Sequence, residues 1–113
     1  MSEVFDRGVL DHLRASLGDD TGVFAQRLIA TFQRQSEEML PQLEQAARDQ
    51  DVPGVAAVAH KLKGSSGSVG GQQLVLLCDE LEHWQGGATE LVGKVTALRE
   101  ELRSLEEELT GYR

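Results

Sequence analysis

The last fifth of the chain carries apolar residues at alternating spacings of four and three. They are Leu91, Val95, Leu98, Leu102, Leu105 and Leu109. This is a heptad pattern, which places all of these side chains on one stripe of an α-helix. Such a stripe is stable only when it is buried. The segment, about residues 88–110, must therefore pack against other apolar surfaces, of the same chain or of a second copy.

Four further segments show helical spacing of apolar residues, and no segment reads convincingly as a strand. They span about residues 6–17, 21–49, 51–69 and 72–85. Pro41 lies inside the second segment, where it removes one backbone donor and should bend the helix without stopping it. Gly70-Gly71 and Gly86-Gly87 leave only short connections between the later segments.

Short connections between amphipathic helices make neighbouring helices antiparallel. We therefore expect an all-α fold, an antiparallel up-down four-helix bundle with an additional N-terminal helix packed against one end. The N-terminal helix should bury a stripe of Val9, Leu10, Leu13 and Leu17, and the stripe of the second helix should start at Phe24. Residues 110–113 should fray, as chain ends commonly do.

Chain length, net charge and cysteine content restrict the class of protein. With 113 residues, the chain has enough for one domain, residues 1–113, and too few for two. A net charge of -8 argues against non-specific binding to nucleic acid or to an anionic membrane, because the field repels phosphate. Cys78 is the single cysteine, which fits a reducing compartment. The sequence shows neither a membrane span nor a signal peptide, so we expect a cytoplasmic protein. Met1 and the compact ends favour a free-standing chain.

His60 lies on the outer face of the predicted third helix. On a helical wheel the apolar residues of this helix cluster on one side, and His60 falls roughly 150° from the centre of that cluster. The core side consists of Val55, Val58, Ala59, Leu62, Ser66 and Val69. The outer neighbours of His60 are Ala56, Ala57, Gly64 and Gly67, all of them small, with Lys63 as the one long side chain beside them.

Gly64 needs a physical reason, because a glycine inside a helix costs about 1 kcal/mol relative to alanine. Close approach of another molecule to His60 would supply one. A surface histidine with a neighbouring lysine, and no further role, is the alternative. The residues by themselves leave these two interpretations about equally supported.

The stretch His60-Lys61-Leu62-Lys63-Gly64-Ser65-Ser66 resembles the signature of the histidine-containing phosphotransfer (HPt) domain. The likeness continues through Gly70 and through the stripe of Leu74, Leu77, Cys78 and Leu81-Glu82. It extends over about residues 5–110 and includes the long preceding helix with its internal proline. Domains of this family are intermediates of multistep phosphorelays, and a four-helix bundle with an added N-terminal helix is the fold that the family implies.

The resemblance implies roles for particular residues. His60 would carry the phosphoryl group, Lys63 would offset its charge, and Gly64 would leave room for it. The surrounding Ala56, Ala57, Lys61 and Gly67 would form the docking surface for a receiver domain. The implied partners are response-regulator receiver domains and a hybrid histidine kinase. No cofactor is expected on this chain, because Mg²⁺ would come from the receiver.

The chain is expected to be a phosphoryl carrier and not a complete kinase. It has no ATP-binding motif, and its glycines lack the strand-turn-helix context of a phosphate-binding loop. Phosphoryl transfer needs positioning and charge neutralisation, and a neutral histidine can serve as the nucleophile. A metal site built from His60, Cys78 and His83 is disfavoured, since Cys78 is expected inside the bundle and His60 outside. We expect no metal on this chain.

Two other functions remain open. A non-catalytic adaptor would bind a receiver domain or a partner helix through the bundle without phosphorylation of His60. The joint presence of His60, Lys63 and Gly64 argues against it, because an adaptor that had lost transfer would be expected to lack one of them. A protein that dimerises through the leucine seam is the other candidate. That seam is needed to close the chain's own core, so we expect a monomer.

Overall fold

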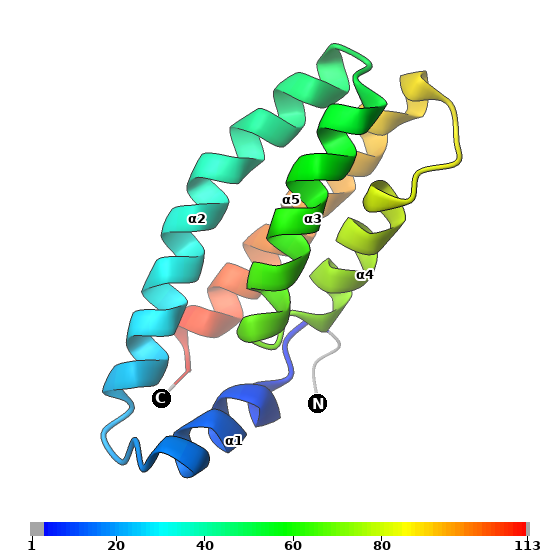
Figure 1. The fold of residues 1–113 in the computed structure, drawn as a ribbon. Helices are drawn as coiled ribbons and strands as arrows, with labels where there is room; N and C mark the ends of the chain where they lie inside the picture. The colour runs from blue at the N-terminus through cyan, green and yellow to red at the C-terminus, as the bar shows by residue number, and fades with distance from the viewer. Residues whose placement is uncertain (1–3, 113) are drawn as a thin grey trace.

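The computed structural model describes residues 4–112. Its elements are α1 (Arg7–Leu17), α2 (Val23–Arg48), α3 (Val52–Ser68), α4 (Gln72–Glu82), a short 3₁₀ turn η1 (Ala88–Glu90) and α5 (Leu91–Thr110). The four helices α2 to α5 form an antiparallel up-down bundle, and α1 crosses its lower end near the start of α2 and the end of α5 (Figure 1). The predicted fold class is confirmed, and within residues 4–112 there is no strand.

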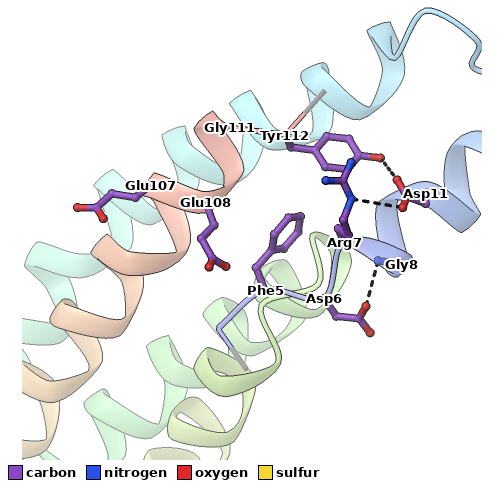
Figure 2. A pocket seen from close by; sticks show the side chains of 9 residues that line it. All are labelled: Phe5, Asp6, Arg7, Gly8, Asp11, Glu107, Glu108, Gly111 and Tyr112. Carbon is purple, nitrogen blue, oxygen red and sulfur yellow. Dashed lines mark hydrogen bonds and ion pairs between the residues drawn. The ribbon is translucent and has the colours of Figure 1, made fainter. Parts of the chain in front are cut away.

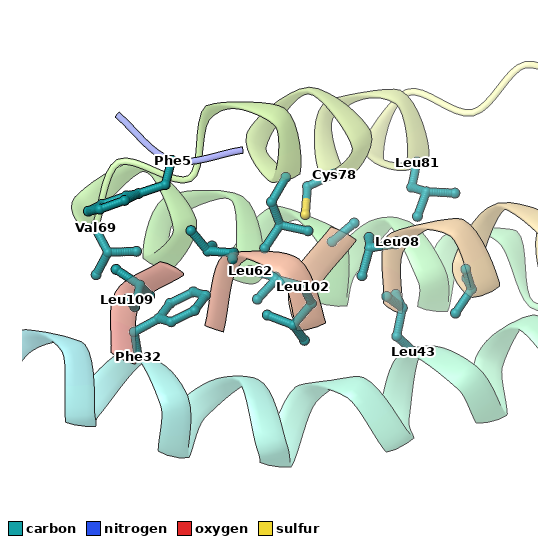
Figure 3. Packing of buried hydrophobic residues seen from close by; sticks show 14 of the residues in the cluster. Phe5, Phe32, Leu43, Leu62, Val69, Cys78, Leu81, Leu98, Leu102 and Leu109 are labelled. Carbon is teal, nitrogen blue, oxygen red and sulfur yellow. The ribbon is translucent and has the colours of Figure 1, made fainter. Parts of the chain in front are cut away.

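The heptad seam of α5 lies at the centre of the core. All six of its residues are buried, none of them more than 3% exposed. Leu43 from α2, Leu62 from α3 and Cys78 from α4 face this seam from the other helices (Figure 3). The apolar stripes of four helices thus remove one another from water, which is the main source of stability for such a bundle.

Local signals fix where the helices begin. At the start of α2, the carboxylate of Asp19 accepts hydrogen bonds from the backbone N–H groups of Phe24 (3.2 Å) and Ala25 (3.1 Å). At the start of α3, Asp51 accepts from Gly54 N–H at 3.0 Å. All three bonds satisfy donors that a helix leaves unpaired at its first turn.

The turn between α3 and α4 depends on Gly70. Its φ is 84°, in the left-handed region that favours glycine, and a Cβ there would collide with the backbone carbonyl of Asp6. Asp6 and Gly70 are also joined directly, because Asp6 N–H donates a hydrogen bond to Gly70 O at 2.8 Å. The segment before α1 is therefore anchored to the turn that joins the two helices of the candidate site.

Several of the predicted helix boundaries are wrong. The second helix starts at Val23 and not at 21, because Gly22 adopts a φ of 77°. The fourth stops at Glu82 and not at 85, where the chain turns and the Trp84 indole donates to Gly87 O at 3.1 Å. Residues 88–90 form a 3₁₀ turn, so the last α-helix begins at Leu91.

The predicted stripe of α1 is only partly buried. Leu10 is inaccessible to solvent, whereas Val9 and Leu17 are exposed, and so is Phe24 at the start of α2. The reason is the placement of α1, which lies across the end of the bundle and not alongside its four helices (Figure 1). Periodicity reveals which residues share a face of a helix, but it does not reveal how much of that face is covered.

The predicted fraying of residues 110–113 is also wrong for the residues described. Thr110 is still helical, and Tyr112 is only 1% exposed. The Tyr112 hydroxyl donates to the Asp11 carboxylate at 2.6 Å, and the rings of Phe5 and Tyr112 meet edge to face with centroids 6.0 Å apart (Figure 2). These contacts join the end of α5 to α1. Arg113 lies outside the described residues.

Among the helices described, none combines the length and the apolar character that crossing a bilayer requires.

Candidate functional site

His60 stands on the solvent side of α3, near the middle of the helix. Its side chain is 68% exposed, while its neighbours Ala59 and Leu62 are fully buried on the opposite side. The bundle therefore holds the backbone of His60 in place while the imidazole faces water. This is the placement that the helical wheel predicts.

Glu82, at the end of α4, contacts both functional side chains of α3. One carboxylate oxygen lies 3.0 Å from His60 Nδ1, and the other lies 2.6 Å from Lys63 Nζ. Lys63 also reaches Asp79 on α4, at 3.2 Å. His60 and Lys63 are thus joined through the two oxygens of a single carboxylate on the neighbouring helix.

The charged forms of Lys63 and Glu82 stabilise each other. The hydrogen bond from Lys63 is the largest cause that lowers the pKa of Glu82 below its usual value, with a smaller lowering contribution from His60. In turn, hydrogen bonds to Glu82 and then to Asp79 raise the pKa of Lys63. At neutral pH Glu82 is therefore a carboxylate and Lys63 an ammonium.

The ionised state of Glu82 decides the tautomer of a neutral His60. A carboxylate only accepts hydrogen bonds, so the proton between Nδ1 and Glu82 belongs to Nδ1. The lone pair of the neutral ring then lies on Nε2. The arrangement leaves Nε2 as the nucleophilic atom of a largely exposed imidazole.

The face around His60 is open. A Cβ added to Gly64 would meet no heavy atom within 4 Å, and at Gly67 it would meet only Val75, at 3.8 Å. Ala57 and Lys61 are exposed and Ala56 is half-buried. The residues predicted for the site and for docking therefore lie on one accessible surface of α3. Nothing in the fold of the chain itself requires glycine at position 64.

The two serines of the motif point away from this surface. Ser66 is buried and donates to Leu62 O at 2.6 Å. Ser65 is half-buried and donates to the Gln35 side chain at 3.0 Å, which links α3 to α2. Their contacts are structural, as the wheel suggests.

The contacts of Asp79 and Glu82 with Lys63 and His60 were not predicted from the sequence. Glu82 is visible in the sequence as part of the motif stripe, but its contact with His60 depends on how α3 and α4 pack. The available signal was the three-residue spacing from Asp79 to Glu82, which puts both carboxylates on one face of α4. A face with two acids opposite a helix with His60 and Lys63 predicts such pairing.

The histidines and the cysteine do not gather into a metal site. Cys78 is buried, and that burial raises the pKa of its thiol to about 12, whereas His60 and His83 are exposed. Asp79, Glu82 and His83 do have ligand-type atoms within 4.8 Å of one another. Both Glu82 oxygens in that group already contact Lys63 and His60. We assign no metal to these residues.

Known proteins are similar to this chain in sequence and in fold. The family model of the Hpt domain matches residues 27–112. Multistep phosphorelay regulator 1 of Schizosaccharomyces pombe is 24% identical over 82 residues, which are 73% of this chain and 28% of that protein. The chain thus spans less than a third of the length of this curated relative.

A solved structure agrees over the full length. The crystal structure of histidine-containing phosphotransfer protein B (HptB) from Pseudomonas aeruginosa PAO1 superposes with a TM-score of 0.79 and 26% sequence identity, covering 100% of both chains. The family match takes in α3, α4 and α5 and most of α2, including every residue of the site around His60. The chain therefore belongs to the Hpt domain family, the histidine phosphotransfer domains of phosphorelays.

Proposed function

We propose that His60 carries a phosphoryl group between the aspartates of receiver domains. The observation that carries the proposal is the hydrogen bond between His60 Nδ1 and Glu82 at 3.0 Å, together with the 68% exposure of the His60 side chain. This contact supports Nε2 as the nucleophile, because it leaves the lone pair of a neutral ring there on a largely exposed side chain. An exposed histidine without that contact would have no fixed tautomer.

In the proposed transfer step, no proton has to leave the site. The bond between phosphorus and the receiver's aspartyl oxygen breaks as the bond between phosphorus and Nε2 forms, and the electron pair leaves with the aspartate. The proton on Nδ1 stays in place, so the phosphorylated ring is a cation facing the Glu82 carboxylate. In the return step the N–P bond breaks, and its electron pair goes back to Nε2.

Lys63 and Gly64 would assist this step in different ways. The Lys63 ammonium, on the turn of α3 that follows His60, would offset charge on the phosphoryl oxygens. Gly64 would leave space for the receiver, whose approach would also cover Ala56, Ala57, Lys61 and Gly67. The partners are then receiver domains, including that of an upstream hybrid histidine kinase, and the Mg²⁺ of the reaction would be bound by the receiver.

The protein is proposed to act as a monomer. The seam of α5, its best surface for pairing with a second copy, is already buried within the bundle. Light scattering of the purified chain should give the monomer mass of 12.3 kDa. A mass of twice that value would contradict the proposal.

The test is phosphotransfer from a panel of phosphorylated receiver domains in the presence of Mg²⁺. The wild-type protein should acquire an acid-labile, alkali-stable label, and His60→Gln should acquire none. His60→Gln should keep the wild-type circular dichroism spectrum and melting temperature, because the side chain faces water. Label on the variant would exclude His60 as the carrier. Binding of a receiver without label on the wild type would favour a non-catalytic adaptor.

A further inference from the structure

Lys63 is already paired with two carboxylates before any phosphoryl group arrives. Its ammonium lies 2.6 Å from Glu82 Oε1 and 3.2 Å from Asp79 Oδ1. With neutral histidines, the cluster of His60, Lys63, Asp79 and Glu82 has one positive and two negative charges. Phosphorylation would add a positive charge to the ring, but the phosphoryl oxygens still have to compete with two carboxylates for the single ammonium.

The two carboxylates differ in how easily they release Lys63. Glu82 is 20% exposed, makes the shorter contact and also holds His60. Asp79 is 53% exposed and makes the longer contact. His83 Nδ1 lies 3.4 Å from the same Asp79 oxygen and 3.0 Å from the Asp79 backbone carbonyl. Both neighbours of Nδ1 are acceptors, so this nitrogen carries a proton and remains a partner for Asp79 once Lys63 has left.

We propose that Asp79 is a positioning residue that competes with the phosphoryl group for Lys63 and so favours its onward transfer. The inference rests on the proposed function of His60 and adds a determinant of the transfer equilibrium. Asp79 acts through Lys63 and does not touch the reacting atoms. While Asp79 holds the ammonium, the phosphoryl oxygens are less well neutralised, and the phosphorylated state of His60 is less stable relative to a phosphorylated receiver.

Removing the charge of Asp79 should therefore strengthen the hold on the phosphoryl group. In Asp79→Asn, Lys63 keeps Glu82 but loses its second carboxylate partner, so its ammonium turns more readily to the phosphoryl oxygens. The transfer equilibrium with a receiver should move toward the phosphorylated protein by about two- to fivefold, the range expected for one exposed ion pair. The pKa of the second ionisation of the phosphoryl group should also fall, because the ammonium favours the dianion.

Two readouts test this. The protein is first loaded with phosphoramidate, a small-molecule phosphoryl donor that needs no receiver, and the phosphoryl group is titrated by ³¹P NMR. The equilibrium constant is then measured with the receiver that reacts fastest in the panel. Glu80→Gln is the matched control: it removes the same charge from the adjacent residue of α4, but Glu80 pairs with Lys94 at 3.0 Å and not with Lys63.

A second background shows whether Asp79 acts through Lys63. In Lys63→Met, the additional change Asp79→Asn should alter the equilibrium no more than Glu80→Gln does. An undiminished effect of Asp79→Asn in that background would overturn the proposal, and so would an Asp79→Asn protein that behaves like Glu80→Gln. Failure of phosphoramidate to label His60 in the wild type would instead contradict the proposed function itself, which separates the two hypotheses.

Discussion

At the scale of single residues, the chemistry of His60 is set from the neighbouring helix. The motif supplies the imidazole on α3, but the proton on Nδ1 is held by Glu82 of α4. The same carboxylate keeps Lys63 beside the histidine. Glu82 thus orients two side chains at once, and it would compensate the positive charge that the ring gains in the proposed phosphorylated state.

Replacing Glu82 should therefore affect transfer more than folding. In Glu82→Ala, His60 loses its orienting acceptor and Lys63 loses its closest partner, and the transfer rate should fall by about ten- to a hundredfold. Glu82→Gln keeps an amide oxygen that can accept from Nδ1, so it should recover part of the rate. Rapid-quench measurement of label transfer would check both. Equal rates for Glu82→Ala and wild type would show that the tautomer is not controlled from α4.

At the scale of an element, Gly64 lowers the intrinsic stability of helix α3 and leaves the surface beside His60 accessible. Gly64 lies inside the C-terminal half of this helix, and the space where its Cβ would be is empty. An alanine fits there without any collision inside the protein. The cost of glycine is therefore not imposed by packing, which agrees with a role in admitting a partner.

Substitutions at Gly64 should separate stability from docking. Gly64→Ala should raise the free energy of unfolding by about 0.5–1 kcal/mol, because glycine is the poorer helix former. Gly64→Gln should also fold, and it should block transfer from the receiver by occupying the space beside His60. Urea unfolding and the phosphotransfer assay measure the two effects. Normal transfer by a well-folded Gly64→Gln protein would remove the steric argument.

The same element shows how far sequence reasoning reaches. The wheel predicts correctly that His60 faces outward and that Ala59, Leu62 and Ser66 face the core, because the helical repeat alone fixes these directions. It does not give the partners of Lys63. Those depend on the rotation of α4 about its own axis and on its height relative to α3, which arise from the packing of the whole core.

At the scale of the whole molecule, α1 and the end of α5 close the lower end of the bundle through Tyr112. Its hydroxyl donates to Asp11 at 2.6 Å, and the guanidinium of Arg7 lies 5.0 Å from the centre of its ring. The hydrogen bond from Tyr112 is the largest cause that lowers the pKa of Asp11, with burial opposing it and Arg7 adding to it. A residue next to the end of the chain thus takes part in tertiary structure.

This contact predicts a pH-dependent part of the stability. The folded pKa of Asp11 lies below its ordinary value of 3.8, so its contribution is present above that value and is lost as the pH falls through the folded pKa. Tyr112→Phe should lower the free energy of unfolding by about 0.5–1 kcal/mol at neutral pH, since Asp11 is half exposed. The variant should also lose less stability than wild type on acidification below about pH 4.

Asp11→Asn is the matched control for this prediction. Its amide oxygen can still accept from the Tyr112 hydroxyl, so most of the neutral-pH stability should remain while the contribution of Asp11 to the acid dependence is lost. Thermal melts of the three proteins across the acid range measure both quantities. Identical acid dependence of wild type and Tyr112→Phe would contradict the assignment. Asp19 and Glu82, whose pKa values are also lowered, should supply the acid dependence that remains.

The presence of the helices, their order and the outward direction of His60 follow from the sequence alone. These follow from periodicity and from turn residues such as Gly70, which act over a few residues and need no knowledge of the rest of the chain. Three features depend on how the helices pack: α1 buries little more than Leu10, Tyr112 is held by Asp11, and Glu82 and Asp79 share Lys63. Contacts between helices depend on their relative rotation and height, and those are fixed by the sum of core packing, which no local pattern contains.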